Sequence, residues 1–102
     1  MEAEREQELI DRFTLATFME AARLYEEGVA SPQAIDIAMR AGAGLPAGPL
    51  AWADQTGLDV VYQKLADLES RFGARFAPPA SLSARVEHGQ LGIKSGAGYF
   101  NY

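Results

Sequence analysis

The sequence opens with a long stretch, residues 1–27, that contains neither glycine nor proline. Apolar side chains recur within it at three- and four-residue steps, which is the spacing of one side of an α-helix. Gly28 follows, and glycine commonly ends helices because it adopts a left-handed conformation without steric cost. We therefore predict one long helix from about Glu4 to Gly28, around which the rest of the chain must pack.

The apolar arc of this helix covers about half of its circumference when residues are placed roughly 100° apart. The arc holds Ile10, Phe13, Leu15, Thr17, Phe18, Ala21, Ala22, Leu24 and Tyr25. The polar arc holds Arg12, Glu20, Arg23, Glu26 and Glu27. An apolar arc this wide indicates contact with two other elements or with a partner chain. If the arc is an interface, Phe18→Glu should disrupt self-association, and an unchanged dimer mass in a folded variant would exclude the arc.

Asp11 is a charged residue inside this arc, between Leu15 and Phe18 on the helix surface. One interpretation is a solvated carboxylate in an exposed first turn, where a negative charge suits the helix dipole. The other is a polar group kept at a position that faces a ligand. The residues alone favour the first interpretation, because isolated charges are usually solvated.

The next segments predict two short helices separated by a loop. Ser31 is a natural N-cap and Pro32 a natural first residue for the first of them. Its apolar face would hold Ile35, Ala38 and Met39, and its polar side Asp36 and Arg40. Residues 41–48 are small and glycine-rich and predict a loop. A third helix would begin at Pro49 and carry Leu50, Trp52 and Asp54.

The second half of the chain predicts one clear helix and one weak one. Between Gly57 and Gly73, apolar residues recur at helical spacing, namely Leu58, Val61, Leu65, Leu68 and Phe72. Residues 75–80 contain two prolines and should be extended or turn-like. A weak helix over 83–87 precedes a glycine-rich tail. No segment predicts a strand long enough for a sheet, so we expect an all-α fold and a single domain over residues 1–102.

Composition excludes several classes of function. The net charge is −5, which disfavours nucleic acids and anionic membranes as partners. The chain has no cysteine, so disulfides and thiolate metal sites are excluded and a reducing, cytoplasmic location is compatible. No apolar run approaches the roughly 18 residues of a membrane span. The glutamate-rich start does not resemble a signal peptide.

Few residues could carry chemistry. His88 is the only histidine, and it precedes Gly89 at a predicted helix end, with no carboxylate positioned to orient it as a base. No spacing of carboxylates fits a metal site. The segment 94–98, Lys-Ser-Gly-Ala-Gly, lacks the order of a phosphate-binding loop. A packing or turn role is the better interpretation, although Lys94 could contact an anion. Trp52 is interpreted as a core or interface anchor.

Three stretches in order resemble the C-terminal domain of the 3-hydroxyacyl-CoA dehydrogenases. The first contains Ile-Asp-Arg at 10–12, Met-Glu-Ala-Ala-Arg-Leu at 19–24 and Gly-Val-Ala-Ser-Pro at 28–32. The second contains Ile-Asp-Ile-Ala-Met-Arg at 35–40 and Gly-Pro-Leu-Ala-Trp-Ala-Asp at 48–54. The third contains Val-Glu-His-Gly-Gln-Leu-Gly at 86–92, Lys-Ser-Gly-Ala-Gly-Tyr-Phe at 94–100 and a final Tyr102.

This resemblance implies a compact bundle of about five helices, similar to the C-terminal domain of 6-phosphogluconate dehydrogenase, that dimerises and closes an acyl-CoA cleft. Members of the family oxidise L-3-hydroxyacyl-CoA with NAD. Their catalytic histidine–glutamate pair and their NAD site lie in a preceding Rossmann domain. The resemblance therefore implies that this chain itself holds no catalytic pair, metal or cofactor, and that NAD would be bound by a missing domain or subunit.

One active-site position of the family falls within this chain. The family has an asparagine in a motif similar to Val-Asn-Arg, and the matching residue here is Asp11. An asparagine amide can donate a hydrogen bond to a substrate carbonyl, whereas an ionised aspartate only accepts. The resemblance to the second, duplicated helical domain of longer family members implies a relaxed catalytic duty and favours a buried or interface position for Asp11.

Three hypotheses follow. The first is a dimerising, cleft-forming domain of an NAD-dependent 3-hydroxyacyl-CoA dehydrogenase of fatty-acid β-oxidation or aromatic-acid degradation. The second is a stand-alone helical interaction module that kept the fold without catalysis. The third is a small acyl-CoA-binding protein, whose basic patch would come from Arg71, Arg75, Arg85 and Lys94.

Overall fold

The computed structural model describes residues 2–102 and contains five α-helices and two short 3₁₀ turns. The long α1 spans Glu2–Glu26, followed by α2 at Pro32–Ala43 and α3 at Pro49–Thr56. Next come α4 at Leu58–Phe72 and a 3₁₀ turn, η1, at Ala74–Phe76. The chain ends with α5 at Ala80–Glu87, a 3₁₀ turn, η2, at Ile93–Ser95, and a short tail. The predicted all-α class is confirmed.

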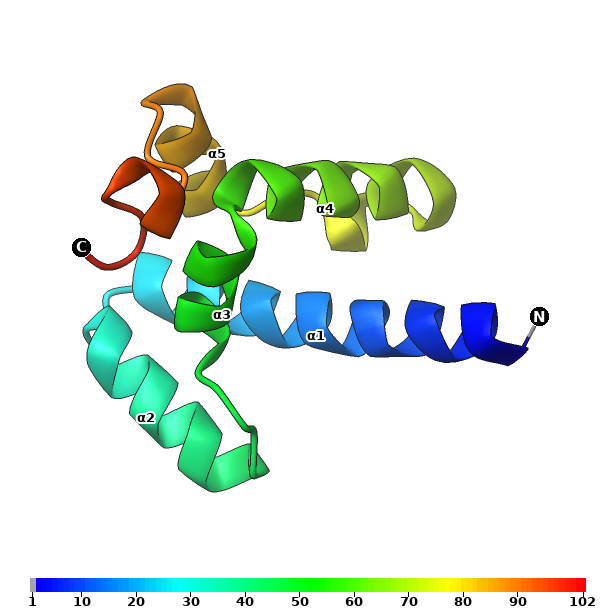
Figure 1. Cartoon of the computed structure of the whole chain (residues 1–102), viewed down its shortest axis with the longest axis horizontal. Helices are drawn as coiled ribbons and strands as arrows, with labels where there is room; N and C mark the ends of the chain where they lie inside the picture. Colours follow the sequence, from blue (N-terminus) through cyan, green and yellow to red (C-terminus); the bar gives the residue numbers. More distant parts are fainter. Residues whose placement is uncertain (1) are drawn as a thin grey trace.

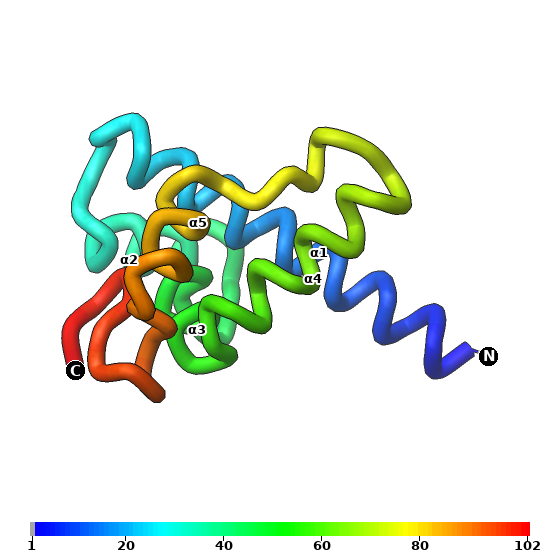
Figure 2. Tube along the Cα trace, turned by 90° about the horizontal axis from the view of Figure 1, so that it is seen from above, coloured from blue at the N-terminus to red at the C-terminus, as the bar shows by residue number. Residues whose placement is uncertain are grey.

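Helix α1 is the spine of the bundle (Figure 1). Helix α4 runs antiparallel to its N-terminal half, while α2, α3, α5 and the tail gather around its C-terminal half. Figure 2 shows the first turns of α1 extending beyond the other helices. The two ends of α1 therefore have different surroundings: one is enclosed by four elements and the other is flanked by α4.

The hydrophobic core lies against the C-terminal half of α1. Leu15, Phe18 and Ala22 pack there with apolar side chains from the other helices, among them Leu50, Leu58, Val61, Leu65 and Leu82. Because α1 contacts α2, α3 and α5, the prediction that its wide apolar arc meets more than one element is confirmed. Phe18 is 0 % exposed, so it belongs to this core, and its use as a probe of a surface interface was wrong.

Helix boundaries follow local signals where such signals exist. The Ser31 hydroxyl accepts a hydrogen bond from the Ala34 amide at 3.2 Å, which caps α2 as predicted. Helix α2 then continues to Ala43 and ends at Gly44, whose φ of 66° is left-handed. The predicted loop from residue 41 therefore begins three residues late, because the helix ends at the glycine with the left-handed backbone rather than at the first glycine.

The last third of the chain differs from the prediction in one boundary. Helix α5 begins at Ala80 rather than at 83, directly after the two prolines. The tail forms only isolated β-bridges, from Ala97 to Gly92 and to Asn101, so no strand occurs among residues 2–102. None of the described helices combines the length and apolar character needed to cross a membrane.

Candidate functional site

A groove of about 680 Å³ lies between the N-terminal half of α1 and the facing side of α4. Its lining is mixed and includes Glu8, Asp11 and Arg12 from α1 with Lys64 and Arg71 from α4. The antiparallel arrangement of the helices explains these pairs, since Glu8 meets Arg71 and Asp11 meets Lys64. This groove contains Asp11, the residue that the sequence singled out.

Asp11 lies in the third turn of α1 rather than the first, because the helix begins at Glu2. The interpretation through the helix dipole is therefore wrong, since that effect fades beyond the first turn. One carboxylate oxygen accepts a hydrogen bond from the Gln7 amide at 2.9 Å. The other lies 3.9 Å from the Lys64 ammonium, and the Asp11 side chain is 36 % exposed. Asp11 is thus neither fully solvated nor buried, and it faces the groove.

Three arginine side chains stack on an aromatic pair, Phe72 and Phe76, whose ring centroids are 6.1 Å apart. Two of these arginines, Arg12 and Arg71, also line the groove. The Arg12 guanidinium carbon lies 4.6 Å from the Phe72 centroid and 5.3 Å from that of Phe76. Arg71 stacks over Phe72 at 4.9 Å and Arg75 over Phe76 at 5.0 Å. The helical periodicity places Arg12 on a polar arc but does not reveal this cluster, because its aromatic partners lie 60 and 64 residues further along the chain.

Asp36 is buried, so its placement on the polar side of α2 was wrong. Its two carboxylate oxygens accept hydrogen bonds from the Leu50 and Ala51 amides at 2.9 and 2.8 Å, which caps the start of α3. Burial raises the pKa of Asp36 above its ordinary value, although these two hydrogen bonds oppose the shift. A side chain at Gly48 would collide with this carboxylate. Asp36 therefore acts as a structural anchor between α2 and α3.

Asp54 plays the same part for the C-terminal tail. It is 1 % exposed and accepts three hydrogen bonds, from the Tyr99 and Phe100 amides and from the Tyr102 hydroxyl. Burial, followed by the Asp54 carboxylate, raises the pKa of Tyr102 above its ordinary value. Any side chain at Gly92 or Gly98 would overlap atoms of Asp54, so only glycine lets the tail approach this closely. The predicted packing and turn role of the tail is confirmed.

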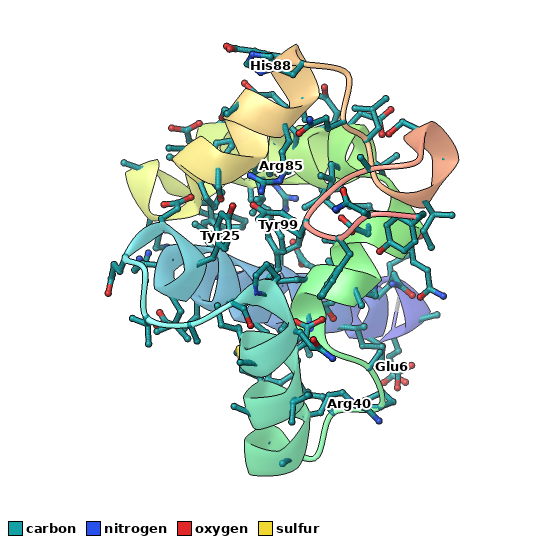
Figure 3. The ribbon with its side chains drawn as sticks, turned by 90° about the vertical axis from the view of Figure 1, so that its left-hand side faces the viewer. Glu6, Tyr25, Arg40, Arg85, His88 and Tyr99 are labelled. Carbon is teal, nitrogen blue, oxygen red and sulfur yellow. The ribbon has the colours of Figure 1, made fainter. Side chains whose placement is uncertain are left out.

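An aromatic cluster holds α5 against α1 and the tail (Figure 3). Arg85 donates hydrogen bonds to the Gly98 carbonyl at 3.1 Å and the Tyr25 hydroxyl at 2.8 Å, and its guanidinium lies 4.3 Å from the Tyr99 centroid. Burial raises the pKa of Tyr99 to about 12, against the lowering effect of the Ser81 hydroxyl and of Arg85. Tyr99 is therefore neutral at physiological pH, and this cluster is structural.

The other residues considered from the sequence, His88 and the basic residues, form contacts within the chain. The His88 Nδ1 lies 2.7 Å from the Ala84 carbonyl oxygen at the outer end of α5, so the ring caps its own helix (Figure 3). Lys94 lies 2.6 Å from Asp59 at the start of α4 and lowers the pKa of that carboxyl. Of the four basic residues considered as an acyl-CoA patch, Arg71 pairs with Glu8, Arg85 with the Gly98 carbonyl and Lys94 with Asp59.

Trp52 lines a second, smaller hollow of about 260 Å³ with Phe13, Thr14 and Thr17 of α1 and the loop before α3. The Thr14 and Thr17 hydroxyls donate to carbonyls of their own helix, so little hydrogen-bonding capacity faces the hollow. Three apolar side chains on this side of α1 are largely exposed: Leu9, Ile10 and Phe13, at 68, 57 and 62 %. We call these three residues the exposed stripe.

The fold and these sites can now be compared with known proteins. A family model described as the C-terminal domain of 3-hydroxyacyl-CoA dehydrogenase matches residues 9–102. The chain belongs to this family. The all-helical bundle, the long first helix that carries Asp11 and the glycine-rich tail are accordingly features of a 3-hydroxyacyl-CoA dehydrogenase C-terminal domain.

Named relatives support the assignment and show how much of them this domain represents. A probable 3-hydroxybutyryl-CoA dehydrogenase of Bacillus subtilis is 41 % identical over 93 residues, which cover 90 % of this chain and 32 % of the relative. The 3-hydroxybutyryl-CoA dehydrogenase of Clostridioides difficile is 38 % identical over 95 residues, covering 92 % of this chain and 34 % of the relative. The chain therefore spans about a third of these relatives.

Solved structures give the same result. The (S)-3-hydroxybutyryl-CoA dehydrogenase of Ralstonia eutropha superimposes with a TM-score of 0.86 at 35 % identity, over 90 % of this chain and 33 % of that one. A 3-hydroxybutyryl-CoA dehydrogenase of Escherichia coli gives a TM-score of 0.85 at 38 % identity, over 90 % of this chain and 20 % of that one. The C-terminal domain fold is thus shared closely.

Proposed function

We propose that this C-terminal domain closes the acyl-CoA cleft of an NAD-dependent 3-hydroxyacyl-CoA dehydrogenase. The family match over residues 9–102 carries the proposal, together with relatives about three times as long as this chain. The NAD site and the catalytic pair would belong to another domain of the polypeptide or to a separate subunit. The relatives whose names specify a 3-hydroxybutyryl-CoA substrate favour an acyl thioester as the ligand.

Asp11 gives the proposal its chemical detail. The sequence resemblance assigns Asp11 to the position of the family asparagine, and its side chain faces the groove between α1 and α4. Its oxygens are engaged by Gln7 and Lys64, and an ionised carboxylate has no hydrogen to donate to a substrate carbonyl. A negative charge here would also oppose the charge that develops on that oxygen. We therefore assign the domain a role in shaping the cleft rather than in supplying a donor.

Self-association is the second part of the proposal. The exposed stripe leads into the apolar hollow beside Trp52, so one side of α1 presents apolar surface across several turns. Apolar surface of this kind on a small domain favours burial against another chain. A second copy of the chain is the partner that the family resemblance implies.

Oxidation of NADH with acetoacetyl-CoA tests the catalytic part. The chain alone should show no turnover, and turnover by it would overturn the assignment of the NAD site to another domain. A chimera in which this chain replaces the C-terminal third of the Bacillus subtilis relative should turn over slowly. Asp11→Asn in that chimera should raise kcat by about tenfold or more, because a donor toward the substrate oxygen is restored.

A matched control separates this effect from a general change in groove charge. Asp67 also lines the groove, but on α4 and away from the family position. Asp67→Asn should leave kcat of the chimera unchanged. Equal gains from both substitutions would argue against a special role for the position of Asp11.

The alternative function is a helical interaction module without catalysis. The exposed stripe favours it as much as it favours a dehydrogenase subunit, since both need a partner surface. The chimera distinguishes the two functions. A module that only mediates interaction would support association of the chimera with itself, but neither the chimera with Asp11 nor its Asp11→Asn variant would turn over substrate.

A further inference from the structure

We propose that Arg12, Arg71 and Arg75, gathered around Phe72 and Phe76, form a binding site for a phosphate-bearing ligand at the groove between α1 and α4. Arg12 and Arg71 line the same groove as Asp11, and none of the three arginines belongs to the exposed stripe. The identification of coenzyme A as the source of the phosphate rests on the proposed function, whereas phosphate recognition by the arginines does not.

The aromatic pair fixes the guanidinium groups in space. Arg12 stacks against both rings, at 4.6 and 5.3 Å, while Arg71 and Arg75 each stack against one. Stacking uses the flat face of a guanidinium and leaves the N–H donors along its edge available. The three arginine side chains are therefore restricted before any ligand binds, which lowers the entropic cost of binding.

The charges in this cluster are incompletely balanced. Arg71 lies 2.7 Å from Glu8 and 3.7 Å from Asp67, so its charge is shared with two carboxylates. Within residues 2–102, neither Arg12 nor Arg75 forms a salt bridge or a side-chain hydrogen bond. Two cations therefore lack an anionic partner on a chain whose net charge is −5. An anionic ligand would supply the missing countercharge.

The number of donors in this cluster favours phosphate over carboxylate. A carboxylate has two oxygens, which suit the fork of one arginine, whereas a phosphate monoester offers three terminal oxygens and can accept from two forks. The groove that Arg12 and Arg71 help to line has a volume of about 680 Å³, which leaves room for the organic part of such a ligand. A phosphate ester or diphosphate of a nucleotide-sized molecule fits these features.

Titration calorimetry of the chain with pyrophosphate, coenzyme A and pantetheine, which has no phosphate, tests the proposal. Pyrophosphate and coenzyme A should bind, more weakly as salt is raised, and pantetheine should not. Arg75→Gln should weaken both by about threefold or more, through loss of one charged donor. Arg75 is exposed, so this variant should still fold.

Two further variants make the result specific. Glu8→Gln should tighten binding, because it releases Arg71 from its closest carboxylate. Arg40→Gln removes the same charge from an exposed position on α2 and should change nothing. Absence of pyrophosphate binding, or equal effects of Arg75→Gln and Arg40→Gln, would overturn the site. Binding of pyrophosphate with weaker binding of coenzyme A would support the site and point to a source of phosphate other than the proposed substrate.

Discussion

Asp54 and Asp11 are both carboxylates on helices of the same small bundle, yet they have opposite surroundings. Asp54 is 1 % exposed and receives three hydrogen bonds from the tail, two of them from backbone amides. The Asp11 side chain is 36 % exposed and receives one hydrogen bond, from its own helix, with Lys64 nearby. One carboxylate is enclosed by the chain itself, and the other faces a groove that the chain leaves open.

The same contrast extends to the regions around them. Near Asp54, the tail and α5 pack together, and the tyrosine hydroxyls of this region form hydrogen bonds within the chain. Along the first half of α1, ion pairs are half exposed and the exposed stripe has no cover among residues 2–102. The region around Asp54 is therefore complete within this chain, whereas the region around Asp11 has the character of a surface built for contact with something else.

The largest effect should come from removing the anchor of the complete region. Asp54→Ala leaves the Tyr99 and Phe100 amides without an acceptor inside the protein, and the Tyr102 hydroxyl loses its partner. We expect a loss of about 3–5 kcal/mol in the free energy of unfolding, measured by urea denaturation. Asp59→Ala is the control, because Asp59 forms a half-exposed ion pair with Lys94 and should cost less than about 1 kcal/mol. Similar losses in the two variants would contradict the contrast.

The second effect concerns Asp36, whose pKa is raised by burial. Between its ordinary value of 3.8 and the raised value, the folded protein keeps a proton that the unfolded chain has released. The contribution of Asp36 to stability should therefore fall as pH rises through this window. Measured by urea denaturation, the stability of the wild type relative to Asp36→Asn should decrease as pH rises from about 4 to 7.

A control with the opposite sign is available for this measurement. Lys94 lowers the pKa of Asp59, so the contribution of Asp59 is present above the ordinary value of 3.8 and is lost as pH falls below it. The wild type relative to Asp59→Asn should therefore show no decrease between about pH 4 and 7. A rise with pH in the Asp36 comparison would show that its hydrogen bonds from Leu50 and Ala51 outweigh the burial.

These carboxylates also show how far the sequence predicts the structure. The sequence predicts the helix boundaries at Ser31, Gly57 and Gly73. Capping residues and glycines determine where a helix begins or ends through contacts within a few residues of the chain. The burial of Asp36 was not predicted, because it depends on Gly48 bringing α3 onto the carboxylate from 12 residues further along the chain. Arg12 was missed for the same reason, since Phe72 and Phe76 reach it only through the antiparallel course of α4.

The helical wheel of α1 illustrates the limit most directly. Periodicity placed Phe13 and Phe18 on one apolar arc, and both are on it. It did not show that Phe18 would be enclosed by the core while Phe13 stays 62 % exposed. That distinction depends on where the other helices stop along α1, which is a property of the whole chain. The assignment of Asp11 to the family position remains a prediction that the chimera must test.

The smallest effect on stability, and the sharpest test of the open region, comes from Phe13→Glu. Because Phe13 is exposed within one chain, the substitution should change the free energy of unfolding by less than about 0.5 kcal/mol once dissociation is separated from unfolding. If the exposed stripe is the surface of self-association, wild type should scatter light as a dimer at micromolar concentration and Phe13→Glu as a monomer. Phe18→Glu cannot serve here, since a buried charge would unfold the core.

Val29→Glu is the matched control for that experiment. Val29 is 63 % exposed, like Phe13, but it lies in the turn after α1 and outside the exposed stripe. Its substitution should leave the mass of the particle unchanged. A monomeric wild type, or a folded Phe13→Glu variant that keeps the dimer mass, would remove the exposed stripe as the interface. Self-association would then no longer explain why the first half of α1 is more exposed than the second.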